Sequence, residues 1–428
     1  MRSFFLCFSL FISALAVSAQ TQVTVIKSAR MFDGKGDRMI TPGLVVISAG
    51  KIQSVGGAAP AAAKVIDLGD ATLLPGFIDA HTHLTMDFDL DYNAARLKAL
   101  DRTTAESAIR ATVNARKTLM AGFTTVRDVG SADFLDVGLR NSINAGIVPG
   151  PRMLVAVHAL GATGGHCDDG AGFRFGLLNH ESGPMDGVIN SADQARFAVR
   201  WNIKYGADVI KTCATGGVLS PTDDVDVPQL SEGELEAIVT AAHELRRKTA
   251  AHAHGSEGAK RAVLAGIDSI EHGTFLNDET LRLMREKGTY LVPTLSVRSG
   301  IAEAKFPPLV RQKADLAMQS QDSLVRRALA MGVKIALGTD AAVYPHGDNA
   351  LEFVLMVADG MPVAQALHAG TSTAADLLGL ANKIGTLENG KIADLVAVPG
   401  NPLDDIKVTQ SVFFVMKEGI VYRNDRAK

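Results

Sequence analysis

Residues 76–83 read Gly-Phe-Ile-Asp-Ala-His-Thr-His, an apolar stretch that ends in His81 and His83. We expect a buried β-strand here. Alternate residues of a strand point to the same face, so both histidines could bind one metal ion. Two histidines at this spacing are more often ordinary residues than ligands, and the neighbouring segments must decide between these interpretations.

Beyond this stretch, short β-rich apolar runs alternate with helix-like segments from about residue 75 to residue 375. This alternation is typical of βα units and a parallel sheet. The candidate strands are 76–81, 124–128, 153–157, 209–213, 250–254, 269–272, 290–294 and 334–340. Eight such strands predict an α/β fold, a (β/α)8 TIM barrel, over residues 74–380.

Two helices of this region carry recognisable start signals. Ser231 followed by Glu234 forms a capping box, which predicts a helix leading into strand 250–254. Met361 and Pro362 open another helix, because proline suits the first helical turn.

The chain ends differ from the barrel region, because short alternating strands replace the helical patterns at 23–26, 44–47, 395–398 and 413–416. Neither end has enough strands for a stable sheet of its own. We therefore expect residues 20–73 and 381–428 to form one small β-sandwich together.

Residues 1–19 have the composition of a signal peptide. Arg2 precedes an apolar run over 4–16, and small residues end at Ala19, where we expect cleavage. A membrane-spanning helix needs roughly 20 apolar residues, and this run is shorter. We expect an exported protein, periplasmic or secreted, without a membrane anchor after cleavage. Its remaining cysteines, Cys167 and Cys213, are too few for a disulfide framework, and we interpret Cys213 as a packing residue.

The overall charge favours a small-molecule substrate. Lys and Arg total 43 against 46 Asp and Glu, a formal net charge of −3. Such a balance provides no positive field for nucleic acid.

Lys211 lies within an apolar candidate strand, where an unpaired lysine is costly. A carbamate formed with CO2 would resolve this cost, because it turns the cation into a carboxylate that can bridge two metal ions. Burial favours this by lowering the pKa of the amine. The alternative is a structural lysine with a salt bridge inside the barrel.

Further candidate ligands lie at strand ends, the face where barrel active sites are built. The full set is His81, His83, Lys211, His252, His272 and Asp340. Imidazole and carboxylate ligands suit two divalent ions, with zinc as the expected metal. Such a pair would activate a bridging hydroxide, and Asp340 would carry its proton to the leaving amine.

This ligand set, in this strand order, resembles the amidohydrolase superfamily, and residues 385–396 resemble that superfamily's return into its β-sandwich. Segments 122–128, 214–220 and 270–273 are similar to the branch of Xaa-Pro dipeptidases and related carboxypeptidases, also labelled imidazolonepropionase-like. The intervals of 41 residues from Lys211 to His252 and 20 residues from His252 to His272 resemble those of ochratoxin-hydrolysing members.

The resemblance implies that His81, His83 and Asp340 hold the more buried metal and that His252 and His272 hold the other, with Lys211 as the bridge. It implies hydrolysis of a C-terminal amide bond in dipeptides or N-acyl amino acids, with ochratoxin A as a candidate substrate, and a homo-oligomer. Imidazolonepropionases lack the bridging lysine. A cyclic-amide hydrolase, a deaminase and a binding protein on an inactive barrel are the alternatives.

Three residues are weaker candidates for substrate binding. His166 and His254 lie near strand ends, where loops shape specificity, and a role away from the substrate is equally compatible with their positions. Arg298 could pair with a substrate carboxylate, although a solvated surface arginine is the more common case. Arg127 and Asp128 are expected to form a structural pair near the barrel mouth.

Overall fold

A computed structural model describes residues 22–178, 180–320 and 323–426. The expected signal peptide over 1–19 lies outside these residues. No helix in the described ranges combines the length and apolar character needed to cross a membrane.

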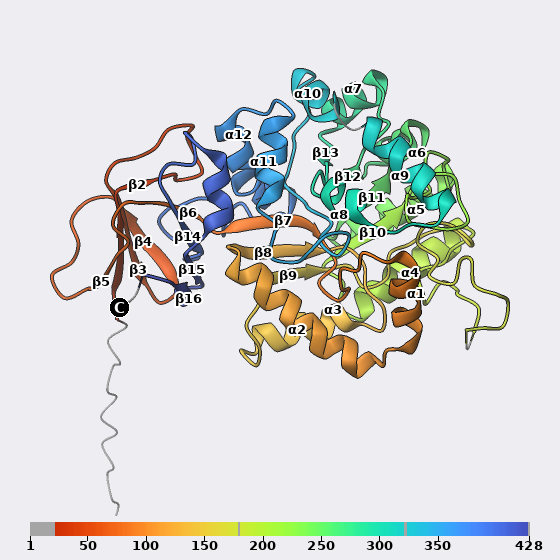
Figure 1. Ribbon diagram of the computed structural model, residues 1–428, viewed down its shortest axis with the longest axis horizontal. Coiled ribbons are helices and arrows are strands. Elements are labelled where there is room, and N and C mark those ends of the chain that lie inside the picture. Colours follow the sequence, from red (N-terminus) through yellow and green to blue (C-terminus); the bar gives the residue numbers. More distant parts are fainter. Residues whose placement is uncertain (1–21, 179, 321–322, 427–428) are drawn as a thin grey trace, which may run out of the picture.

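The two chain ends contribute strands to a pair of sheets (Figure 1). The first has the order β4-β3-β1-β5, with β1 Thr24–Ser28, β3 Gly43–Ser48, β4 Lys51–Val55 and β5 Lys64–Asp67. The second has the order β16-β15-β14-β6-β2, with β2 Arg30–Met31, β6 Ala71–Pro75, β14 Leu395–Pro399, β15 Phe414–Lys417 and β16 Ile420–Asn424. Ile47 and Ile52 of the first sheet share an apolar cluster with Leu73, Leu395 and Phe414 of the second.

Parallel strands form the central part of the chain. One sheet consists of β7 Phe77–Thr82, β8 Phe123–Asp128 and β9 Arg152–Val155. Another consists of β10 Val209–Cys213, β11 Lys248–Ala253, β12 Ser269–His272 and β13 Tyr290–Val292. Leu160, beyond the end of β9, connects the two sheets: its N–H donates to Lys211 O at 2.9 Å, and Cys213 N–H donates to its carbonyl at 2.8 Å.

The expected eighth strand, 334–340, differs from the prediction. Within this segment only Ile335 makes a bridge, to Leu291 of β13. The segment nevertheless lies between β13 and β7, because Ala80 N–H donates to Leu337 O at 2.8 Å and Asp340 N–H to His81 O at 2.7 Å. Its end cannot stay extended, because Asp340 has a φ of +60°.

Helices surround the parallel strands (Figure 1). They are α1 Tyr92–Asp101, α2 Thr104–Met120, α3 Leu135–Asn144, α4 Ala192–Lys204, α5 Glu232–Glu244, α6 Ser256–Ala265, α7 Asp278–Lys287, α8 Val297–Glu303, α9 Pro308–Ser320, α10 Leu324–Ala330, α11 Leu351–Ala358, α12 Val363–Ala369, α13 Ser372–Leu377 and the 3-10 helix Ile406–Ser411. The capping box of Ser231 and Glu234 is confirmed at the start of α5, and α12 begins directly after Pro362, as predicted.

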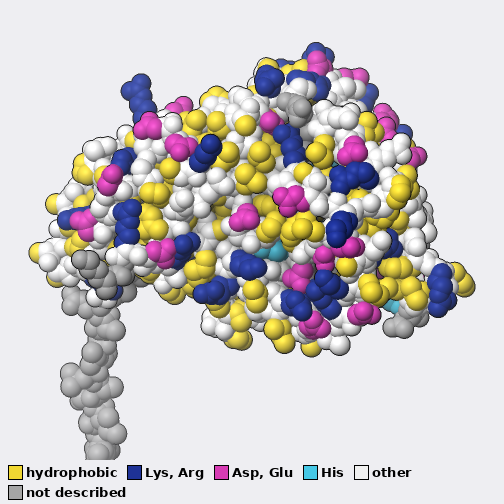
Figure 2. All heavy atoms as spheres, in the orientation of Figure 1, with side chains coloured by type: hydrophobic (Ala, Val, Ile, Leu, Met, Phe, Trp, Pro, Cys, Tyr) yellow, Lys and Arg dark blue, Asp and Glu magenta, His cyan; other side chains and the backbone are white. Residues whose placement is uncertain are grey.

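Figure 2 shows acidic and basic side chains intermixed over one face of the molecule, with a histidine visible among hydrophobic side chains near its middle. The mixture agrees with the near-balanced composition.

Candidate active site

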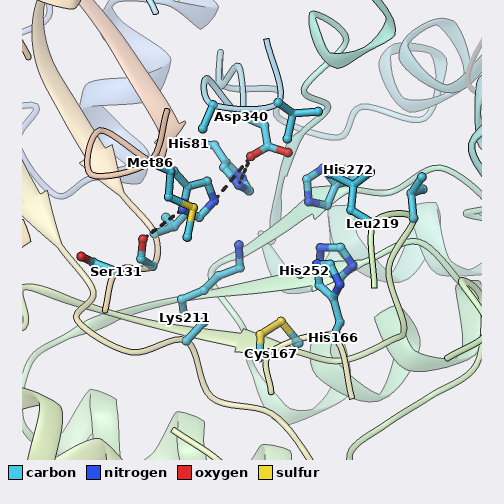
Figure 3. Close-up of a pocket in the computed structure, with 18 of the residues that line it drawn as sticks. His81, Met86, Ser131, His166, Cys167, Lys211, Leu219, His252, His272 and Asp340 are labelled. Carbon is cyan, nitrogen blue, oxygen red and sulfur yellow. Dashed lines mark hydrogen bonds and ion pairs between the residues drawn. A yellow bond between two sulfur atoms is a disulfide. The ribbon is translucent and has the colours of Figure 1, made fainter. Parts of the chain in front are cut away.

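The six predicted metal ligands line one cavity of about 350 Å³ (Figure 3). They come from β7 and the residue after it, from β10, β11 and β12, and from the segment after β13. Because neighbouring parallel strands end on the same side, residues far apart in sequence meet there. The structure therefore brings the six side chains together, while their role as ligands stays a prediction.

Asp340 lies between two histidines at one side of the cavity. Its Oδ1 is 3.4 Å from Nε2 of His81 and 3.4 Å from Nε2 of His83. His272 also belongs to this side, since its ligand atom lies within 4.8 Å of those of His81 and Asp340. Asp340 and His272 have φ values of +60° and +70°, a conformation that costs free energy in residues other than glycine and that clusters at functional sites.

A second group contains His252, His254 and His272, whose ligand atoms all lie within 4.8 Å of one another; it shares His272 with the first group. His254 is a predicted substrate residue, and the geometry also makes it a possible metal ligand. The spacing of His252 and His254 on one face of β11 is the sequence signal for this proximity.

Hydrogen bonds fix one ring nitrogen of each predicted histidine ligand and leave the other available to a metal ion. Such a partner sets the tautomer and the ring orientation of metal-binding histidines. The pairs are His81 Nδ1 with Glu271 Oε2 at 2.8 Å, His83 Nδ1 with Gly130 O at 3.0 Å, His252 Nε2 with Gly216 O at 3.1 Å and His272 Nδ1 with Thr294 Oγ1 at 2.7 Å. The donor set therefore fits divalent metal ions.

Burial favours the neutral form, the form that binds metals, in three of these imidazoles. It lowers the pKa of His83 to about 4 and the pKa values of His252 and His272 well below their usual range. Burial acts to raise the pKa of Asp340, but the neighbouring His81 and His83 outweigh it and hold that pKa below its usual value. The site thus combines three imidazoles that favour the neutral form with an ionised carboxylate.

Lys211 extends from β10 towards the space between His81 and His272 (Figure 3). Its exposed fraction is 3%, and burial lowers its pKa to about 8. Among the described residues its amine has no hydrogen-bonded or ion-paired partner. The alternative of a salt-bridged structural lysine therefore finds no support.

Arg127 does not pair with Asp128, and this expectation is wrong. Both residues lie on β8, but the Arg127 guanidinium reaches across the interior, where Nη2 lies 2.8 Å from Oε1 of Glu271. The other carboxylate oxygen of Glu271 holds His81. Burial acts to raise the pKa of Glu271, but Arg127 and His81 outweigh it and hold that pKa at about 2. The sequence signal for this support was a glutamate directly before His272, within a strand that the pattern of βα units predicts to be buried.

We expect Arg127→Met to lower the free energy of unfolding by about 3–5 kcal/mol, because it leaves the carboxylate of Glu271 buried without its cation. Urea denaturation monitored by circular dichroism measures this loss. Arg110→Met is the control, since the exposed pair of Arg110 with Glu106 contributes only about 0.3–0.5 kcal/mol. Equal small losses in both variants would contradict the assigned role of Arg127.

Cys213 forms a disulfide with Cys167, which corrects its interpretation as a packing residue. Their Cα atoms lie 5.9 Å apart although 46 residues separate them in sequence. The bond ties the loop after β9 to the strand of Lys211, and both cysteines line the cavity (Figure 3). Sequence alone could not find this pair, since it depends on how that loop returns to β10.

The three predicted substrate residues have different positions. His166 lines the cavity and stacks on His252 with ring centroids 4.1 Å apart, and His254 lines it as well. Arg298 on α8 forms an ion pair with Asp359 at 2.9 Å and is not among the described residues that line the cavity. Its contact with a substrate carboxylate stays a prediction.

Parallel strands surrounded by helices, with histidine, lysine and aspartate side chains gathered in one cavity, define the class of protein. Comparison with known families identifies that class. The model of the amidohydrolase family matches residues 72–423, so the chain belongs to the amidohydrolase family. It is a hydrolase of amide bonds, as its relatives also indicate.

Ochratoxinase from Aspergillus niger is 33% identical over 436 residues, which cover 96% of this chain and 88% of that protein. The crystal structure of a Xaa-Pro dipeptidase with methionine bound in its active site is 40% identical, with a TM-score of 0.89, and covers 94% of this chain and 100% of its own. The crystal structure of the A. niger ochratoxinase is 30% identical, with a TM-score of 0.82 and coverage of 95% and 97%. These likenesses confirm the resemblance and imply a TIM-barrel-like fold.

Proposed function

We propose that this chain is a two-metal hydrolase that cleaves the C-terminal amide bond of dipeptides or N-acyl amino acids, with ochratoxin A as a candidate substrate that would yield ochratoxin alpha and phenylalanine. The observation that carries the proposal is the convergence of six potential ligands on one cavity, with the buried Lys211 amine between its two sides. The proposal includes a closed (β/α)8 barrel and a β-sandwich formed by both chain ends.

His81, His83 and Asp340 would hold one divalent ion and His252 and His272 the other, with zinc the expected metal. Lys211 would bridge them as a carbamate, formed when its neutral amine adds to CO2 and releases a proton. The lowered pKa of Lys211 supports this step, because a larger share of the amine is neutral near pH 8. When bound, such ions lower the pKa of water and polarise a substrate carbonyl.

Asp340 would act as the proton carrier. Its pKa lies below the usual value, so the carboxylate is ionised at neutral pH and can accept a proton from the attacking water. It would then donate this proton to the nitrogen of the leaving amine, which otherwise departs poorly.

The cavity walls support a small substrate with an apolar part. Val218, Leu219, Ile301 and Val343 form an apolar side of the cavity, whose volume suits a small molecule. Among the described lining residues the basic ones are Lys211 and histidines. A substrate carboxylate would therefore bind at His166 or His254, which the sequence suggested only as substrate contacts, rather than at Arg298, which the sequence suggested for the carboxylate.

A substrate panel tests the proposed function. We expect zinc-loaded protein, supplied with bicarbonate, to release free amino acids from dipeptides, N-acyl amino acids or ochratoxin A, measured by chromatography. Ammonia release would indicate a deaminase, and ring opening of cyclic amides would indicate a cyclic-amide hydrolase. Failure to release an amino acid from any panel member would contradict the proposal.

We also propose an exported homo-oligomer with a signal peptide over residues 1–19. A mature N-terminus near residue 20 and a mass above one chain in light scattering would support this proposal.

A further inference from the structure

Lys313 is a buried lysine that belongs to α9, outside the ligand-bearing strands. Its exposed fraction is 6%, and its Nζ donates to Gly217 O at 2.7 Å, Ser220 O at 2.6 Å and Asp223 O at 3.0 Å. The three protons of the ammonium group match three carbonyl acceptors, and Asp223 Oδ1 lies 3.2 Å away to balance its charge. All these acceptors belong to one loop.

This segment, the 216–223 loop, follows β10 and reaches three parts of the cavity. The carbonyl of Gly216 accepts the hydrogen bond from His252 Nε2. Val218 and Leu219 line the apolar side of the cavity. Ser220 Oγ lies 3.1 Å from His166 Nδ1. One loop therefore contacts a predicted metal ligand, the substrate wall and a predicted substrate residue.

The loop backbone packs tightly against these rings. A Cβ at Gly217 would lie 2.1 Å from His166 Nδ1, so only glycine fits there. His166 in turn stacks on His252 with centroids 4.1 Å apart. A displacement of the loop would consequently move His166 and remove the partner that orients His252.

We propose that Lys313 is a positioning residue of the active site: it fixes the 216–223 loop, and through that loop it orients His252 and His166 and holds the wall of Val218 and Leu219. It is not among the described residues lining the cavity, so it acts through the loop rather than on the substrate. The inference rests on the proposed function for its kinetic consequences, but the position of the loop is independent of any substrate.

Lys313→Met tests the proposal by removing the ammonium while keeping an apolar stem of similar length. We expect one of the two zinc ions to be lost to a chelator about 10–100-fold more readily, because an orienting partner of a ligand is disturbed. KM for apolar substrates should rise and kcat should fall together. The 216–223 loop carries both Gly216, whose carbonyl orients His252, and the apolar wall of Val218 and Leu219. Amide hydrogen exchange should accelerate within residues 216–223.

Lys417→Met is the matched control. Lys417 on β15 is also buried, at 4% exposure, and its Nζ donates to Gly150 O at 2.9 Å, away from the cavity. Its loss should reduce the unfolding temperature without changing zinc release, KM or exchange in the loop. A merely structural role for Lys313 would make the two variants alike.

Lys313→Gln keeps two of the donors and should give intermediate effects; it replaces the methionine variant if that protein does not fold. Unchanged zinc release and unchanged loop exchange in folded Lys313 variants would overturn the inference. If wild-type protein hydrolyses no amide, the proposed function is contradicted but the inference about Lys313 is not. The rate of zinc release and the amide hydrogen exchange of residues 216–223 test the positioning role of Lys313 without any substrate.

Discussion

Replacement of Lys211 with alanine is expected to lower kcat/KM by roughly 10³-fold or more, because metal ions supply several kcal/mol of transition-state stabilisation and each 1.36 kcal/mol corresponds to tenfold in rate. The alanine cannot form the bridging carbamate, so we expect zinc content to fall as well. Steady-state kinetics and elemental analysis of the same preparation measure both effects.

Two controls distinguish the loss of the bridging carbamate at Lys211 from a non-specific loss of folding or activity. Lys248→Ala removes an exposed lysine at the start of the adjacent strand β11 and should leave turnover unchanged. Short carboxylic acids such as acetate or propionate should restore part of the activity of Lys211→Ala by replacing the missing carboxylate. Near wild-type turnover in Lys211→Ala would contradict the role of this residue.

Asp340→Asn is expected to lower kcat by about 10²–10⁴-fold, the range for losing a positioned proton carrier. Asparagine has nearly the same shape, but it cannot accept the proton that Asp340 would pass to the leaving amine. Turnover of an amide substrate and of an ester with the same acyl group measures this loss, since an alkoxide or phenolate departs with less help than an amine.

The ester substrate distinguishes the proposed role from loss of a ligand. If Asp340 carries the proton, Asp340→Asn should lower kcat for the ester less than it lowers kcat for the amide. Asp348→Asn, an exposed neighbour, should leave both reactions unchanged. Equal losses for ester and amide with unchanged zinc content would rule out Asp340 as the proton donor to the leaving group.

Features set by local sequence were predictable. The bounds of β10 and β12 agree with the candidate strands 209–213 and 269–272. The convergence of the six potential ligands followed from the general rule that parallel strands present their carboxyl ends on one side. Residue positions at strand ends thus sufficed to locate the cavity.

Features set by contacts between distant residues were not predictable. The Arg127–Glu271 pair joins β8 to β12, and the Cys167–Cys213 disulfide depends on the return of a loop. Lys313 gives no local signal, since its acceptors are carbonyls about 90 residues earlier in the chain. The irregular eighth segment was also not predictable: within 334–340 a single bridge joins Ile335 to Leu291 of β13, and most of its other backbone hydrogen bonds join it to residues distant in sequence, such as that from Ala80 N–H to Leu337 O.

A diffraction experiment on zinc-loaded crystals tests the central proposal most directly, with anomalous maps collected on both sides of the zinc absorption edge. We expect two zinc peaks in the cavity and electron density for a carboxyl group attached to Nζ of Lys211. A bare amine at Lys211 with fewer than two zinc ions in fully active protein would contradict it.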